Sequence, residues 1–268
     1  MKRLFVQSDD YGFTRGIVDG TIHAIKNGIV RNTGIFINMP CAEYAVERIK
    51  EVPDVCFGID INLLAGYPVT DPKLIPHLVN PDGHFKSSRQ LLKECKLLSV
   101  DKFIYHFEVD PFVYEETLLE TENQVKKFIE MVGRKPEYVN SHSIMTLNSE
   151  AAGKAIQEKY EIPGLSSNLY FGEDINDVGY FTDIPDLTLE EQLSFDTADF
   201  LINYVFPRID DERVAYYGCH CGYIDKELIP ETRLTIQRMN DASAVCDPRV
   251  ISYIKENDIR LVTYRDLL

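Results

Sequence analysis

The chain has 268 residues, of which 44% are hydrophobic, so its length suits one large α/β domain or two small ones. Its formal net charge at pH 7 is -15, from 43 acidic and 28 basic residues. Because phosphate binding needs a basic face, this charge disfavours nucleic acid and acidic membranes as partners, whereas sugars and other small uncharged substrates stay compatible.

The six cysteines favour a reduced, cytoplasmic protein. None forms a Cys-x-x-Cys pair, and the spacing of Cys219 and Cys221 is not that of a zinc knuckle. The N-terminal segment has the pattern of a strand rather than of a secretory signal peptide. No window approaches 18 uninterrupted apolar residues, so we expect no membrane span.

Strand and helix patterns alternate along the first part of the chain. We expect strands at residues 3–7, 33–38 and 56–63, and helices at 16–27 and 42–50. This alternation predicts parallel strands covered by helices.

The rest of the chain is less regular until its last third. Residues 66–90 carry four prolines and predict a long functional loop, and residues 162–192 also predict a loop. The remaining expected elements are a mostly helical stretch at 101–132, strands at 135–141, 214–219 and 260–263, and helices at 231–240 and 248–256. No repeat or composition break divides the chain, so we expect one domain over residues 1–268, a (β/α) barrel variant with mainly parallel strands.

Carboxylate and imidazole side chains occur repeatedly where the predicted strands end. Asp9 and Asp10 follow the first strand, Asp60 interrupts the third, and His142 and His220 follow two later strands. The carboxyl ends of parallel strands meet at one edge of a sheet, where functional side chains gather. The sequence therefore predicts that these five residues line one rim.

Each of these residues also has a structural interpretation. Adjacent ionised carboxylates repel one another, and a divalent cation would offset the repulsion of Asp9 and Asp10 while one of them deprotonates water. Alternatively, one of them caps the following helix in a solvated turn. Asp60 lies in an apolar run, so it needs a cation or hydrogen-bond donors, and a paired core aspartate is the alternative. Either histidine alone would also suit a structural role.

Five segments in order carry a resemblance over nearly the whole chain. They are FVQSDDYGFTRGIVDGTIHAIKNGIVRNTGIFINMP, FGIDINLLAGYPV, ETENQVKKFIEMVGRKPEYVNSHSIM, YGCHCGYID and VISYIKENDIRLVTYRDLL. Together they resemble the YdjC-like carbohydrate deacetylases, also called the chitooligosaccharide deacetylase family. The resemblance implies a barrel that uses a divalent metal to hydrolyse the N-acetyl group of an amino sugar in a short oligosaccharide.

The resemblance also implies roles for the five rim residues. Asp10 would be a metal ligand and Asp9 the general base. The position of Asp60 would supply a second ligand and His142 the third. His220 would lie beside the reacting amide as general acid.

Three positions depart from the family pattern. Asp60 stands where the family usually has histidine, Ile144 stands where its His-x-His cluster has a second histidine, and Cys221 replaces a proline. Two carboxylates and one imidazole form a hard, negative donor set. This set favours Mg²⁺ or Mn²⁺, with Zn²⁺ as the alternative.

Three further residues are candidates for binding a sugar. Tyr11 would stack on a sugar ring, with a packed core aromatic as the alternative. Asn38 and Asn62 would hydrogen-bond sugar hydroxyls or, alternatively, hold the backbone.

We therefore expect a metal-dependent carbohydrate N-deacetylase that acts on a small carbohydrate. Another metal-dependent sugar or phosphate-ester hydrolase on the same barrel remains an alternative, because a fold does not determine a reaction. An inactive carbohydrate-binding member of the family is a third interpretation. A homodimer would be unsurprising for such a barrel.

Overall fold

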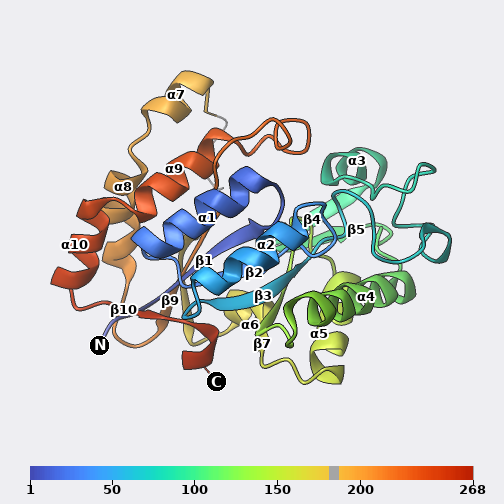
Figure 1. The fold of residues 1–268 in the computed structure, drawn as a ribbon, viewed down its shortest axis with the longest axis horizontal. Coiled ribbons are helices and arrows are strands. Elements are labelled where there is room, and N and C mark those ends of the chain that lie inside the picture. Colours follow the sequence, from blue (N-terminus) through green and yellow to red (C-terminus); the bar gives the residue numbers. More distant parts are fainter. Residues whose placement is uncertain (181–186, 268) are drawn as a thin grey trace.

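A curled parallel sheet forms the centre of the molecule (Figure 1), as seen in a computed structural model that describes residues 1–180 and 187–267. The strand order is β7-β6-β3-β2-β1-β9-β8, with β10 also paired to β1. The strands are β1 (Arg3–Tyr11), β2 (Asn32–Ile35), β3 (Cys56–Ile61), β6 (Tyr138–Ser141), β7 (Gly164–Leu165), β8 (Ile175–Tyr180), β9 (Val214–Cys219) and β10 (Arg260–Val262). Each pairing recorded in this sheet is parallel, which confirms the predicted α/β class, a barrel variant with mainly parallel strands, and the curled sheet forms a half-barrel.

Helices follow most of these strands and pack against the sheet and one another (Figure 1). They are α1 (Arg15–Asn27), α2 (Ala42–Arg48), α3 (Ser88–Glu94), α4 (Tyr114–Val132), α5 (Leu147–Lys159), α6 (Ser166–Phe171), α7 (Leu189–Ser194), α8 (Thr197–Phe200), α9 (Ile236–Val245) and α10 (Pro248–Glu256). Short 3-10 turns lie at Ile49–Glu51, Pro72–Leu74, Phe206–Arg208 and Tyr264–Asp266, and a π turn lies at Leu201–Val205. Within the described ranges, no helix combines the length and apolar character that a membrane crossing requires.

Helix α1 shows how local sequence sets these elements. The Thr14 side chain accepts a hydrogen bond from the Ile17 amide, which satisfies one of the free N–H groups at the start of the helix. The helix then buries one apolar face. A Cβ on Gly20 would lie 2.6 Å from the Gly222 backbone, so glycine allows α1 to approach the segment that follows His220.

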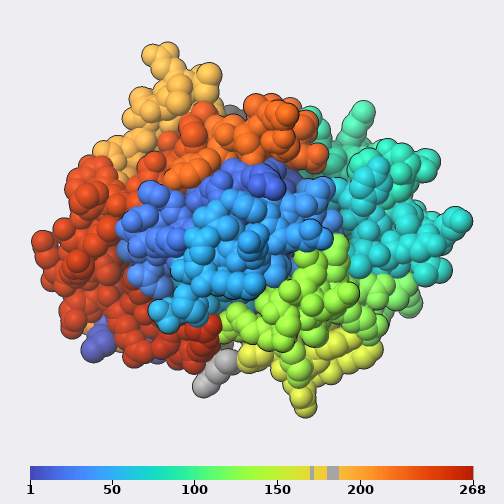
Figure 2. Space-filling view, in the orientation of Figure 1, coloured from blue at the N-terminus to red at the C-terminus, as the bar shows by residue number. Residues whose placement is uncertain are grey.

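The region between α3 and α4 differs from the prediction. Instead of helix from residue 101, the chain forms an antiparallel hairpin of β4 (Leu97–Asp101) and β5 (Ile104–Phe107). Lys102 makes the turn with a φ of 53°, a left-handed conformation that ends any helical run. This region, coloured teal, forms one end of the face in Figure 2, while α1 and α2 cover its centre.

Two other predicted segments also differ. The expected loop at 162–192 contains β7, α6, β8 and the start of α7, and its residues 181–186 lie outside the described part of the chain. The helix expected at 231–240 is α9, which begins five residues later, at Ile236.

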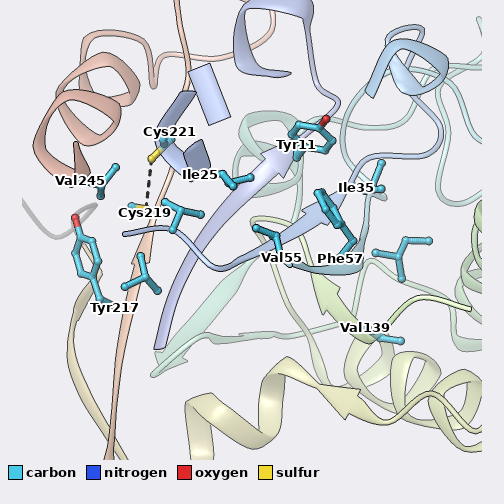
Figure 3. Packing of buried hydrophobic residues seen from close by; sticks show 14 of the residues in the cluster. Tyr11, Ile25, Ile35, Val55, Phe57, Val139, Tyr217, Cys219, Cys221 and Val245 are labelled. Atoms are coloured by element: carbon cyan, nitrogen blue, oxygen red, sulfur yellow. Dashed lines mark hydrogen bonds between the residues drawn. The ribbon is translucent and has the colours of Figure 1, made fainter. Parts of the chain in front are cut away.

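The core lies between the sheet and its helices (Figure 3), and Tyr11, Phe57 and Tyr217 belong to it. The cysteines are free thiols, and the sulfurs of Cys219 and Cys221 lie 3.7 Å apart. The hydrogen bond with the neighbouring thiol of Cys221 and burial raise the pKa of Cys219 well above its ordinary value, so Cys219 favours the thiol form.

Candidate active site

An irregularity in β1 brings two adjacent aspartates into one cavity. Neighbouring residues of a regular strand point to opposite faces. The pairing of β1 with β2 shifts register between Ser8 and Tyr11, and Asp10 has a φ of 69°. Aspartate tolerates this left-handed conformation better than most residues, and the bulge lets Asp9 and Asp10 both line the cavity.

The cavity has a volume of about 570 Å³ and opens at the carboxyl ends of the parallel strands. Its lining includes all five rim residues of the sequence-based prediction, namely Asp9, Asp10, Asp60, His142 and His220. They come from β1, from β3 and from the residues directly after β6 and β9. The shared direction of the strands explains why side chains up to 211 positions apart in sequence (9 to 220) meet here.

Asp10 lies at the centre of the charged contacts. Its Oδ2 accepts a hydrogen bond from Arg238 Nη2 at 2.5 Å and lies 3.9 Å from His220 Nε2. Its Oδ1 lies 2.8 Å from His142 Nδ1. Burial alone would raise the pKa of Asp10, but the opposing charges of His142 and Arg238 hold this pKa well below the ordinary value. Asp10 is therefore an ionised carboxylate inside the protein.

Asp60 has different partners. Its Oδ2 accepts from the Asp10 amide at 2.9 Å, and its Oδ1 accepts from Asn140 Nδ2 at 2.9 Å. Burial raises the pKa of Asp60 well above its ordinary value, and the negative charges of Asp9 and Asp10 add to this effect. A Cβ on Gly34 would lie 1.9 Å from Asp60 Oδ1, so the neighbouring strand β2 makes room for this carboxyl group.

Asp9 is held at the cavity wall by two side-chain amides. Its Oδ1 accepts from Gln7 Nε2 at 2.6 Å and from Asn140 Nδ2 at 3.4 Å. The residue is 7% exposed. A carboxylate fixed in this way and facing a cavity has the placement that a general base requires.

The position of His220 is set through its backbone. Its amide donates to Oδ2 of Asp241, a fully buried residue of α9, at 2.7 Å. Burial lowers the pKa of His220 to about 3, so the imidazole is neutral near pH 7. Burial also raises the pKa of Asp241 to about 7.

Asp10 and His142 are placed to bind a divalent cation, whereas Asp60 is less well placed to do so. Asp10 Oδ1 is buried and makes no hydrogen bond within the described part of the chain, although His142 Nδ1 is 2.8 Å away. Adjacent ligands of an octahedral Mg²⁺ lie about 3 Å apart, since each is about 2.1 Å from the ion. Both oxygens of Asp60 have protein partners, and the described residues contain no group of three or more His, Cys, Asp and Glu placed to hold a metal ion. A ligand role for Asp60 stays a prediction.

The three predicted sugar-binding residues lie away from the cavity lining. Tyr11 is fully buried beside Phe57 (Figure 3), and its hydroxyl donates to the Ala45 carbonyl at 2.9 Å. The prediction that Tyr11 stacks on a sugar is therefore wrong, because its ring belongs to the core.

Asn62 and Asn38 instead hold the loop after β3. Asn62 Oδ1 accepts from the amides of Leu64 and Ala65, and Asn38 Nδ2 donates to the carbonyls of Ala65 and Tyr67. These contacts favour the alternative role of holding the backbone, and contacts of the two residues with sugar hydroxyls stay a prediction.

Sequence reasoning missed Asn140, Arg238 and Asp241. Asn140 precedes His142 by two positions near the end of one strand, so the alternation of side chains could have indicated it. Arg238 and Asp241 lie in a helix with several polar residues, where nothing in the local pattern marks a buried side chain.

The fold and the site define an α/β half-barrel protein with a carboxylate–histidine site at the carboxyl ends of its strands. The chain belongs to the YdjC-like protein family, whose sequence profile matches residues 3–256. It is similar to carbohydrate deacetylase 2 of Listeria innocua, with 25% identity over 99% of this chain and 98% of that protein. It is also similar to a carbohydrate deacetylase of Thermoanaerobacter pseudethanolicus, with 27% identity over 98% of both chains.

A solved structure from Enterococcus faecalis V583 shares the fold. That protein has been proposed to be a cellobiose-phosphate cleavage protein. The two structures superpose with a TM-score of 0.75 at 21% sequence identity, over 99% of this chain and 98% of the other.

Proposed function

We propose that this chain hydrolyses the N-acetyl group of an amino sugar, either free or within a short oligosaccharide. The observation that carries the proposal is the convergence of Asp9, Asp10, His142 and His220 on one cavity. Full-length similarity to proteins named carbohydrate deacetylases supports this reaction class.

In the proposed reaction, the oxygen of a water molecule bonds to the acetyl carbon and the carbon–nitrogen bond then breaks, which releases acetate and an amine. Asp9, held by Gln7 and Asn140, takes the proton of the attacking water. The imidazole of His220, neutral at rest, receives the proton that Asp9 took from the water and delivers it to the leaving nitrogen, which must be protonated to depart.

Asp10 and His142 would hold a divalent cation, with Asp60 as the predicted third ligand. When bound, such a cation would polarise the acetyl carbonyl and lower the pKa of its water. The oxygen-rich donor set supports Mg²⁺ or Mn²⁺, with Zn²⁺ as the alternative.

The test is acetate and amine release from N-acetylglucosamine and short chitooligosaccharides. Chelator-treated protein is assayed with Mg²⁺, Mn²⁺ and Zn²⁺ separately, and a phosphate ester is included as a competing substrate class. We expect acetate and free amine in equal amounts, with loss of both in Asp9→Asn and retention in Asp54→Asn, a matched change at an exposed position. Absence of acetate with every sugar and metal, or phosphate release instead, would refute the proposal.

A further inference from the structure

Arg238 on α9 brings a buried positive charge to the cavity. The residue is 2% exposed, and its guanidinium uses two different N–H groups. Nη2 donates to Asp10 Oδ2 at 2.5 Å, and Nε donates to the Leu234 carbonyl at 2.9 Å. A buried charge costs several kcal/mol unless it is paired, so the ion pair with Asp10 offsets the burial of Arg238.

These contacts restrict the orientation of the Asp10 carboxylate. The guanidinium is planar and is anchored through Nε, so its Nη2 donates along a defined direction. That bond engages Oδ2 of Asp10 and leaves Oδ1 turned toward His142. Rotation of the carboxylate would break a charge-assisted hydrogen bond inside the protein.

The same helix also holds the segment that carries His220. The Arg238 carbonyl accepts from the Gly222 amide at 3.1 Å. Asp241, three residues further along α9, accepts from the His220 amide at 2.7 Å. Helix α9 therefore connects the Asp10 side chain to the backbone on both sides of Cys221.

We propose that Arg238 is a positioning residue that keeps Oδ1 of Asp10 directed at His142. In this arrangement the Asp10 carboxylate and the His142 imidazole would bind one divalent cation together. The inference rests on the proposed function, because that function makes Asp10 and His142 the cation-binding residues of the hydrolytic site. The guanidinium fork matters in addition to the charge. Lysine carries a point charge at the end of its chain and has no donor at the position of Nε.

The experiment compares wild type with Arg238→Lys, Arg238→Met and the control Arg249→Met. Arg249 lies on α10, and its exposed side chain pairs with Asp196 and Asp247. For each protein, calorimetric titration measures the Mn²⁺ affinity and scanning calorimetry measures the midpoint of thermal unfolding. The values of kcat and KM are measured with one N-acetylated oligosaccharide.

We expect both Arg238 variants to bind Mn²⁺ about 10–100-fold more weakly and to lose a similar factor in kcat, as is typical when a partner of a ligating carboxylate is removed. KM should stay close to the wild-type value, and Arg249→Met should match wild type in affinity and kcat. Arg238→Lys retains the charge beside Asp10, so it keeps the test valid where Arg238→Met fails to fold.

Each of the following results would overturn the inference. Wild-type affinity and kcat in Arg238→Lys would mean that charge alone suffices. Tighter Mn²⁺ binding in Arg238→Met would make Arg238 a simple countercharge. A lower thermal midpoint with unchanged affinity and kcat would make its role purely structural. A wild type that neither binds Mn²⁺ nor releases acetate would overturn the proposed function and this inference together, whereas an active wild type with unaltered variants overturns the inference alone.

Discussion

Replacement of Asp241 by asparagine should change how stability depends on pH. Asp241 is fully buried on α9, and burial raises its pKa from 3.8 to about 7. Below pH 3.8 the folded and unfolded chains both hold this proton. As the pH rises, the unfolded chain releases its proton first, so the contribution to stability is lost progressively between pH 3.8 and about 7.

The magnitude follows from the difference between the two pKa values. It corresponds to at most about 4 kcal/mol, and we expect about 2–4 kcal/mol. Asparagine cannot ionise, and its side-chain oxygen can still accept from the His220 amide, which Asp241 Oδ2 accepts at 2.7 Å. Its NH₂ group would face Gln237, whose own amide can rotate to present an oxygen. Asp241→Asn should therefore be more stable than wild type at pH 8, and the two should converge near pH 4.

Urea unfolding at several pH values between 4 and 8 measures this difference, with the exposed Asp54→Asn as the control for an aspartate-to-asparagine change. The control should run parallel to wild type. If the curves of wild type and Asp241→Asn are also parallel over this range, the buried carboxyl group does not control the pH dependence. A wild type that is more stable than Asp241→Asn at pH 8 would contradict the sign of the argument.

Further predictions concern the site and its supports. Asp9→Asn should lower kcat about 10²–10⁴-fold with little change in KM, because it removes the proposed base, and an acetate-release assay with unchanged kcat would exclude that role. Gly34→Ala should cost about 1–3 kcal/mol in urea unfolding, since its Cβ would lie 1.9 Å from Asp60 Oδ1, whereas the control Gly153→Ala meets only a side chain at 3.9 Å and should be neutral or stabilising. Asp60→Ala should weaken metal binding and Asp60→His should shift relative preference toward Zn²⁺, and titrations that show equal affinities in all three proteins would remove Asp60 from the ligand set. Saturating Mn²⁺ at 100 times its Kd should stabilise the wild type by about 2.7 kcal/mol, and identical thermal midpoints with metal and with chelator would argue against a metal site.

Protein groups, as well as any cation, act on the carboxyl groups of the site. Adjacent aspartates predicted mutual repulsion that a metal would relieve. In the structure, Asp10 is paired with Arg238, while Asp60 accepts from Asn140 and the Asp10 amide. Protein groups thus provide partners for each of these two carboxyl groups.

The secondary structure that sequence predicted well is the part with strong local patterns. The strand at Val214–Cys219 and the helix at Pro248–Glu256 agree with the prediction at both ends. Alternation and helical periodicity are properties of neighbouring residues, so they can be read without the fold. The hairpin at Leu97–Phe107 was missed because its first strand is exposed throughout and carries no contrast between a buried and a solvent face.

By itself, the sequence determined most of the alternation of strands and helices and the carboxylates and histidines that follow the strands. Parallel strands place their carboxyl ends together, so this information was enough to predict that five distant residues share one cavity. Tertiary structure alone decided which group faces which oxygen. Arg238 is 228 positions from Asp10, and their pairing depends on how α9 packs against α1 rather than on any local pattern. Tertiary contacts with Phe57 and Ala45 likewise made Tyr11 a core residue, because the free energy of burying an aromatic ring is set by the neighbours that surround it.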